Sequence, residues 1–461
     1  MVNIFIHRRD LRFDDNTTMI KMHKELKDNV IPIFIFNPVQ IYPDKNPYFS
    51  HNLVNYLCKS LKELDSEYKD RDTKLNLFEG DIINILESIH KKETITNLGF
   101  NKDYSPFSKK RDKEIIEWCK KNNITIFCEE DMLLIDIESK KGLNPNSDKP
   151  YVVFTPFMNN LRKYPVEKIK KHKLKYNSKT KLSNKYSISI NEIDKYYVDN
   201  KDLNVIPGRK EGLKIIKKIG HFDNYDKCRN YLTYSTTHLS AYINLGSVSI
   251  REIYHQALKK LGNKSGLITE LYWRDFYYNI LNYFPDNIGN SFRKEYDKIK
   301  WSNNISLLNK WKKGETGFPV VDACMRQMNT TGYMHNRGRM IVASFLTKDL
   351  FIDWRKGEKY FATQLIDYNM SANNGGWQWA AGTGTDAQPY FRIFNPWTQS
   401  EKFDPECKYI KKWIPELEDI PPKDIHTWNI CHNKHKGVYI KPIIDHKTAR
   451  LDTLKKYKQY L

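Results

Sequence analysis

The chain has 461 residues, of which 40% are hydrophobic and 13% aromatic, so it is long and apolar enough for two or three folded domains. Its 76 lysines and arginines outnumber 55 aspartates and glutamates, and the net charge of +21 favours a polyanionic partner, either nucleic acid or an anionic membrane surface. The seven cysteines include no C-x-x-C pair, which argues against a disulfide framework or a structural zinc site. We therefore expect no metal.

Two further absences bear on location. No run of about 18 apolar residues occurs, and the first twelve residues lack an apolar signal core. We expect a soluble intracellular protein, with no membrane partner, in whichever of cytoplasm or nucleus holds its DNA. Nothing indicates an obligate assembly, so we expect a monomer.

Short apolar runs alternate with helical patterns over the first 130 residues. Strands are expected at 2–6, 30–36, 74–78, 94–100 and 124–127, with helices between them, the later ones at about 51–68, 81–90 and 108–121. This alternation predicts a Rossmann-like α/β domain with a parallel sheet. No G-x-G-x-x-G follows the first strand, so nothing marks the domain as a dinucleotide binder.

The next stretch, residues 131–205, has a different character, and we interpret it as a long linker that crosses the surface between domains. Residues 168–185 hold eight lysines and no acid, which fits either a solvated face or part of a DNA-facing field. Helical periodicity dominates from 206 to 461, which predicts an all-α second domain. Nine of the ten tryptophans lie there, from Trp273 onward.

A hydroxyl-rich run opens the helical region, with the order Ser235-Thr236-Thr237-His238-Leu239-Ser240. Beside a helix start, such a run offers O–H and N–H donors to a phosphate, although an ordinary helix cap has the same appearance.

Four residues of the next helical pattern share one face, namely Glu270, Trp273, Arg274 and Tyr277. A carboxylate, an indole, a guanidinium and a phenol on one surface form a plausible platform for a nucleobase. An ion pair beside a core tryptophan is the alternative.

The segment N-N-G-G-W-Q-W at 373–379 carries two tryptophans two positions apart. On a helix such positions diverge by about 200°, so one of the indoles of Trp377 and Trp379 faces inward and the other faces a cavity or the surface. A tight helix corner filled with aromatic residues is an equal alternative.

These motifs together resemble the photolyase and cryptochrome family, in its class I cyclobutane pyrimidine dimer photolyase form. The resemblance is loose over the first 200 residues and dense from about 225 to 415. It implies FAD as cofactor, UV-damaged DNA as partner, and light-driven repair by electron transfer from excited reduced FAD. It also implies an antenna pigment in the α/β domain, a folate or a deazaflavin. Residues 101–112 lack the acidic folate-contact pattern, so the pigment and its absence both stay open.

The resemblance assigns a set of residues to FAD. Arg339 would pair with Asp367 beside the flavin, and Asn373 would face its reactive nitrogen. Asn369 stands where the family usually has Asp, which changes one flavin contact. The complete cofactor set is Tyr225, Thr236, Thr237, His238, Leu239, Ser240, Arg339, Asp367, Tyr368, Asn369 and Asn373.

A second set is assigned to electron transfer and to the lesion. Trp377, Trp354 and Trp301 match a chain of three tryptophans that leads from the flavin to the surface. Asn336 and Met340 match positions that face the lesion, where six-four photolyases have two histidines. The implied DNA and lesion set is Arg229, Glu270, Trp273, Arg274, Tyr277, Asn336, Arg337, Trp379 and Gln399, and Glu270, Asn336, Met340 and Asn373 are assigned to catalysis.

Three other functions remain alternatives. A cryptochrome would sense light without repair, and the lesion-site residues and the lack of a long C-terminal extension argue against it. A repair enzyme restricted to single-stranded DNA, as in the DASH branch, is disfavoured by the G-G-W-Q-W segment and Met340. A flavin-free DNA-binding protein would be colourless.

Overall fold

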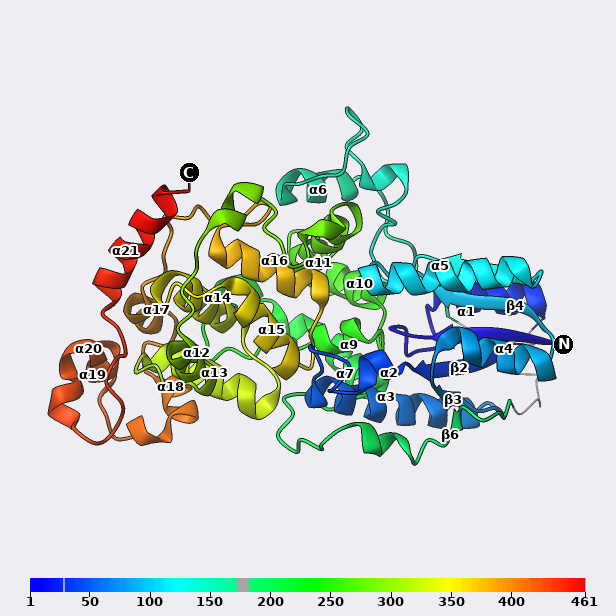
Figure 1. Ribbon diagram of the computed structural model, residues 1–461, viewed down its shortest axis with the longest axis horizontal. Coiled ribbons are helices and arrows are strands. Elements are labelled where there is room, and N and C mark those ends of the chain that lie inside the picture. Colours follow the sequence, from blue (N-terminus) through cyan, green and yellow to red (C-terminus); the bar gives the residue numbers. More distant parts are fainter. Residues whose placement is uncertain (28–29, 172–181, 461) are drawn as a thin grey trace. The chain divides into compact units, whose positions relative to one another are not determined.

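The computed structural model describes residues 1–27, 30–171 and 182–460 (Figure 1). The chain divides into two compact units that interleave in sequence. The first comprises Met1–Asp199, Val205–His221 and His238–Pro285, and the second comprises Asn200–Asn204, Phe222–Thr237 and Asp286–Leu461. These units are cut at other places than 130 and 205, and the domain boundaries expected from the sequence stay a prediction.

The first unit is built on a six-stranded sheet with the order β5-β4-β1-β2-β3-β6. Its strands are β1 (Val2–His7), β2 (Ile31–Phe36), β3 (Asn76–Glu79), β4 (Ile95–Asn101), β5 (Thr125–Glu129) and β6 (Ser187–Ile188). The first five are parallel, with Ile4 between Ile31 of β2 and Leu98 of β4. All five predicted strands are confirmed. The antiparallel β6 has two residues, too few to leave a pattern in the sequence.

Helices cover this sheet, and those predicted between the strands are confirmed. Asn16 caps the first, where its side chain accepts a hydrogen bond from the Met19 amide, as its position before the helical pattern indicates. The helices of this unit are α1 (Thr17–Leu26), α2 (Pro38–Ile41), α3 (His51–Lys69), α4 (Ile82–Lys92), α5 (Pro106–Lys121), α6 (Phe154–Leu161), α7 (Arg209–Lys217), α9 (Ser240–Asn244), α10 (Ile250–Leu261) and α11 (Gly266–Tyr283).

The loop after β1 is held by buried ion pairs rather than exposed to a partner. Arg12 lies 2.6 Å from Asp131, and Arg251 of α10 lies 2.7 Å from Asp15 and 3.0 Å from Asp131. Burial opposes ionisation of Asp131, yet the two arginines lower its pKa to about 2. This network fixes α10 against the end of β1.

The segment expected to be a linker contains α6, whose Phe157 is fully buried and packs on Phe276 of α11. Of the lysine-rich run at 168–185, residues 172–181 lie outside the described part of the chain. The two roles considered for this run, a solvated face and a part of the DNA-facing field, therefore stay predictions.

The second unit is helical throughout, which confirms the predicted α/β then all-α fold class. Its helices are α8 (Tyr225–Cys228), α12 (Ile305–Lys313), α13 (Pro319–Thr331), α14 (Asn336–Ser344), α15 (Trp354–Gln364), α16 (Met370–Ala381), α17 (Pro396–Phe403), α18 (Lys408–Trp413), α19 (Pro422–His426), α20 (Trp428–Cys431) and α21 (His446–Lys458). In residues 1–27, 30–171 and 182–460, no helix is both long enough and apolar enough to span a membrane.

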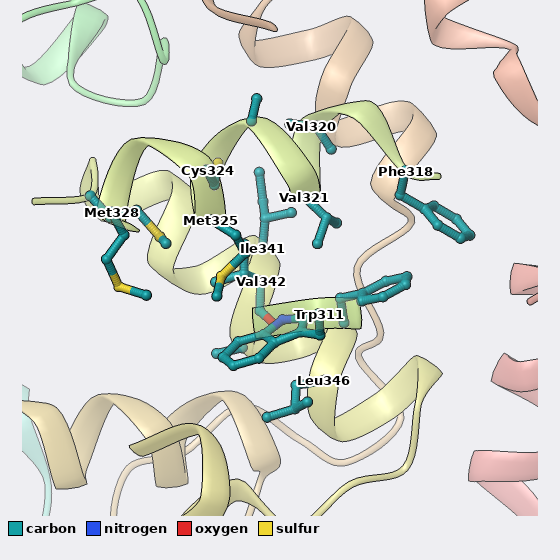
Figure 2. Close-up of a cluster of buried hydrophobic side chains, with 14 of the residues drawn as sticks. Trp311, Phe318, Val320, Val321, Cys324, Met325, Met328, Ile341, Val342 and Leu346 are labelled. Carbon is teal, nitrogen blue, oxygen red and sulfur yellow. The ribbon is translucent and has the colours of Figure 1, made fainter. Parts of the chain in front are cut away.

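A large apolar cluster in this unit packs α12, α13 and α14 together. Figure 2 shows Trp311 of α12 beneath side chains of α13 and beside Val342 of α14. Trp311 is fully buried and donates from its indole N–H to the Val342 carbonyl at 3.1 Å. This core sets the position of α14, which carries Asn336 and Met340.

Candidate functional site

Helix α11 presents the four residues predicted to share one face. Glu270, Trp273, Arg274 and Tyr277 are half-buried, whereas Leu271 and its neighbours on the other faces are buried. The predicted helix and the common face are therefore confirmed. Between residues 270 and 282, these four are the residues of α11 that remain accessible.

The indole of Trp273 is stacked on one side. Phe154 of α6 lies parallel to it, with ring centroids 3.6 Å apart and an interplanar angle of 7°. Tyr277 lies 5.7 Å away at 31°. Phe154 thus covers one face of the indole, and the opposite face points away from Phe154.

Arg274 has partners within its own unit. Its Nη1 donates to the Met132 carbonyl at 2.7 Å and lies 3.4 Å from Asp275, and its side chain is 14% exposed. Asp275 also accepts from the Leu134 amide at 2.8 Å, and burial raises its pKa to about 7. A DNA contact for Arg274 stays a prediction, because these bonds occupy part of its guanidinium.

In the second unit, α14 begins at Asn336, directly after the turn at Gly332 that the sequence predicts. Asn336 is exposed and Met340 half-buried, and the Asn336 Nδ2 lies 3.9 Å from the Met340 Sδ. The two side chains lie together on the accessible face of the helix. A methionine so placed is not part of the core.

Arg339 and Asp367 form the predicted ion pair. Arg339 Nη2 donates to both carboxylate oxygens, at 2.9 and 3.1 Å, and its Nε donates to the Met334 carbonyl. Burial lowers the pKa of Arg339, but Asp367 more than offsets this effect and the pKa is raised. Thr236 of the hydroxyl-rich run lies 3.3 Å from the Tyr333 hydroxyl, whose ring packs near Arg339. Part of the predicted cofactor set is thus brought together.

Asn369 is the N-cap of α16. Its side-chain oxygen accepts from the Ala372 amide at 3.1 Å and from the Ser371 hydroxyl at 2.6 Å. Asn and Asp are about equally good at N-caps. The departure from the family's usual Asp therefore leaves the start of this helix intact.

The amide of Asn373 has a defined orientation. Its Nδ2 donates to the backbone carbonyl of Glu358 at 3.0 Å and to the Glu358 carboxyl at 3.1 Å. In the described part of the chain, its Oδ1 has no hydrogen-bond partner. Burial raises the pKa of Glu358 to about 7, against a smaller lowering by the bond from Asn373. The amide oxygen is the atom left to meet a ligand.

Sequence reasoning missed Glu358. It lies four residues after Trp354 on α15, hence on the same, inward-facing side of that helix. An acid on a buried helix face needs a specific partner, and this spacing is the signal that could have found it.

Trp377 and Trp379 diverge as the helical spacing predicts. Trp377 is 2% exposed and Trp379 is half-buried. Trp377 fits against Gly357 of α15, where a Cβ atom would lie 2.2 Å from the indole. Trp354, at the start of α15, is also buried, and Trp301 is partly buried, 5.1 Å from the Phe351 ring. Trp377 and Trp354 are thus both buried and Trp301 is the most exposed of the three, as the surface end of such a path requires.

Two arginines of the DNA set belong to the same unit, and each lies over an aromatic ring. Arg337 donates to Asn230 at 2.7 Å and lies over the Phe403 ring, while Arg229 lies over Tyr225. Burial lowers the pKa of Arg337, and the nearby charge of Arg229 lowers it further. Each guanidinium could donate charge-assisted hydrogen bonds to a phosphate. Gln399 lies half-buried on α17.

Comparison with known proteins covers both parts of the chain. The family model described as "DNA photolyase" matches residues 3–174, and that described as "FAD binding domain of DNA photolyase" matches residues 267–459. The deoxyribodipyrimidine photo-lyase of Escherichia coli K12 is 35% identical over 480 residues, covering 98% of this chain and 97% of the relative.

Two solved structures are similar over the whole chain. An archaeal photolyase from Sulfolobus tokodaii, solved with two FAD molecules, has 37% identity and a TM-score of 0.88, with complete coverage of both chains. A class III photolyase from Agrobacterium tumefaciens has 30% identity and a TM-score of 0.89, covering 100% of this chain and 98% of that one. From these matches and the site geometry, the chain belongs to the photolyase and cryptochrome family, with a photolyase FAD-binding domain in its C-terminal half.

Proposed function

We propose that the protein is a deoxyribodipyrimidine photo-lyase that repairs cyclobutane pyrimidine dimers in DNA under light, and that it is of class I. The observation that carries this proposal is the 35% identity, over nearly the whole chain, to a protein of that name. The net charge of +21 supports a polyanionic substrate.

The residues present fit FAD. Among the described residues the amide oxygen of Asn373 has no hydrogen-bond partner, and Arg339 and Asp367 form an ion pair in the same unit. Gly376 lies on the accessible face with Asn373, and a Cβ added there would meet no atom within 4 Å. When bound, reduced and light-excited FAD supplies the electron that splits the dimer.

The chain's own residues bind the cofactor and orient it. Asn373 offers its oxygen as an acceptor to a flavin N–H, and Glu358 fixes which end of that amide is presented. Tyr225 and the run from Thr236 to Ser240 would hold the diphosphate of FAD, and Tyr368 and Asn369 would bind its flavin.

The lesion is recognised by two groups of residues. Glu270 accepts from a pyrimidine N–H, and Trp273 and Trp379 pack against the bases, because stacking contributes about 1–3 kcal/mol per base. Asn336 and Met340 face the dimer, and the lack of two histidines there favours a cyclobutane dimer over a six-four photoproduct. A damaged pair costs less to flip out of the helix than an intact one.

Other roles complete the proposal. DNA is contacted by Arg229, Arg337, Arg274, Tyr277 and Gln399. When oxidised FAD must be reduced, electrons would pass from the surface along Trp301, Trp354 and Trp377. The protein acts as a monomer inside the cell, with domains at 1–130 and 206–461 joined by a linker. An antenna pigment stays a prediction, and absorbance beyond that of FAD in the purified protein tests it.

The function is tested by a repair assay on reduced, purified protein with two duplexes. One carries a cyclobutane thymine dimer and the other a six-four photoproduct. Restored thymines only in the first duplex, and only under light, are the expected result. Repair of neither duplex by a protein that retains reducible FAD would contradict the proposal and favour a cryptochrome.

A further inference from the structure

The parallel stack of Phe154 on Trp273 is an unusual contact. Aromatic pairs prefer offset or edge-to-face arrangements to a full face-to-face overlap. Here the centroids are 3.6 Å apart and the planes are 7° from parallel, so the rings overlap almost completely. A geometry that the two rings do not prefer by themselves has to be held by the surrounding structure.

Helix α6 supplies that hold, because it is bound to α11 at both ends. Before its first turn, the Tyr151 carbonyl accepts from the Asn279 amide at 2.8 Å. Just after its last residue, Arg162 donates to the Thr269 hydroxyl at 3.4 Å and lies over the Tyr272 ring. Phe154, the first residue of α6, is 5% exposed. Its backbone is therefore held against α11, and its ring is buried in contact with Trp273.

The consequence for Trp273 is that a base cannot stack on the indole face that Phe154 covers. Phe276 lies edge-on, 5.7 Å from the indole at 82°, and Tyr277 lies 5.7 Å away at 31°, so neither of these rings is stacked on the indole as Phe154 is. The indole plane is thus fixed before any ligand arrives. A preorganised aromatic surface binds a base without the cost of ordering a side chain.

We propose that Phe154 is a positioning residue for the damaged base: by stacking on one face of Trp273, it fixes the indole plane and directs the opposite face to the pyrimidine dimer. This inference rests on the proposed function, since it takes the lesion role of Trp273 as given. Simple core packing is the competing explanation for a buried phenylalanine, and the two differ in whether Phe154 acts through Trp273.

The experiment measures binding in the dark to a duplex with one cyclobutane thymine dimer and to the same duplex without it. The ratio of the two affinities is compared for the holoenzyme and for Phe154→Leu. Phe157→Leu is the matched control, since it removes the same ring from the same helix, where Phe157 packs on Phe276 and Tyr151. Trp273→Ala and the double variant with Phe154→Leu complete a cycle. The Tm and flavin content of each variant are recorded.

We expect Phe154→Leu to lower the preference for the dimer by about threefold to tenfold, the range that a lost aromatic stack implies. Phe157→Leu should lower the Tm by a similar amount and leave the ratio within about twofold. In the Trp273→Ala background, Phe154→Leu should have no further effect on the ratio. If Phe154→Leu loses flavin, Phe154→Met, which has a similar volume but an unbranched side chain that adapts to the space, takes its place.

Two results would overturn the inference while the proposed function stands. One is a Phe154 variant with the dimer preference of the Phe157 control, and the other is a full additional loss in the Trp273→Ala background. A wild-type protein that shows neither dimer preference nor repair would instead contradict the proposed function itself, and this inference with it.

Discussion

At the scale of single residues, the amide of Asn373 shows how a neighbour decides the chemistry of a side chain. An asparagine can present either an oxygen or an NH₂ group to a ligand. Both hydrogen bonds that its Nδ2 donates go to Glu358, and the oxygen is left for a ligand. Glu358 is therefore the residue whose ionisation bears most directly on this site.

The raised pKa of Glu358 gives a signed prediction. A carboxyl with a folded-state pKa of about 7, above its usual 4.5, keeps its proton in the folded protein where the unfolded chain has lost it. Its contribution to stability therefore falls as the pH rises from about 4.5 to 7. Glu358→Gln keeps a hydrogen-bonding group and removes this titration.

We expect the free energy of unfolding of Glu358→Gln, relative to wild type, to rise between pH 5 and pH 8 by up to about 3 kcal/mol. Denaturant unfolding at matched flavin content measures it. Glu401→Gln, at an exposed position of α17, is the control and should show no such rise. A constant difference across this range would contradict the burial of an ionisable Glu358.

At the scale of elements, α16 is the helix on which the proposed site depends most. It carries Asn373 and Trp377 four positions apart on one side and Trp379 on another, and Asn369 caps its start. Gly357 of α15 brings the neighbouring helix close enough to hold Trp377. A substitution of the N-cap Asn369 therefore tests the stability of the helix, whereas substitutions of tryptophans test the proposed function.

Asn369→Ala should lower the free energy of unfolding by about 1 kcal/mol, because an N-cap side chain satisfies an otherwise unpaired backbone N–H. Asn369→Asp should change it by only a few tenths, since Asp caps as well as Asn does. Urea unfolding of the two variants provides the comparison. Equal losses would show that the cap bond to Ala372 contributes little.

Trp301→Phe should prevent light-driven reduction of oxidised FAD and leave repair by pre-reduced protein unchanged. The indole is readily oxidised and a phenyl ring is not, so a chain of tryptophans is interrupted by this change. Bleaching of the oxidised-flavin absorbance under light, with an external reductant present, measures the first effect. Trp413→Phe is the control, since Trp413 is another partly buried indole packed on the same core. Undiminished photoreduction in Trp301→Phe would remove it from the chain.

At the scale of the whole molecule, the charge of +21 predicts DNA binding that weakens with salt. Each phosphate contact contributes about 0.9 to the slope of log affinity against log salt on duplex DNA. Arg229→Gln and Arg337→Gln should each lower that slope by about 0.9. Arg450→Gln, exposed on α21, should leave it unchanged.

Arg274→Gln distinguishes two roles for the arginine on α11. A lower slope would support the phosphate contact predicted from the sequence. An unchanged slope with a lower Tm would assign Arg274 to its bonds with Met132 and Asp275 instead. Binding to an undamaged duplex at several salt concentrations is the measurement.

The sequence by itself determined the alternation of strands and helices, the helix faces at 270–277 and 336–340, and the divergence of Trp377 from Trp379. These follow from local periodicity and capping, which depend on residues a few positions apart. The family resemblance rested on motifs of the same short range.

Only the tertiary structure decided which partners these residues have. Glu358 meets Asn373 across fifteen positions, Phe154 meets Trp273 across more than a hundred, and Arg274 turns to Met132 rather than to solvent. The segment at 131–205, expected to be a linker, contains α6, which packs on α11. Its aromatic residues become buried only after the chain has folded back on itself. A local spacing such as that of Trp354 and Glu358 indicates a buried face, but the partner from a distant segment depends on the packed fold as a whole.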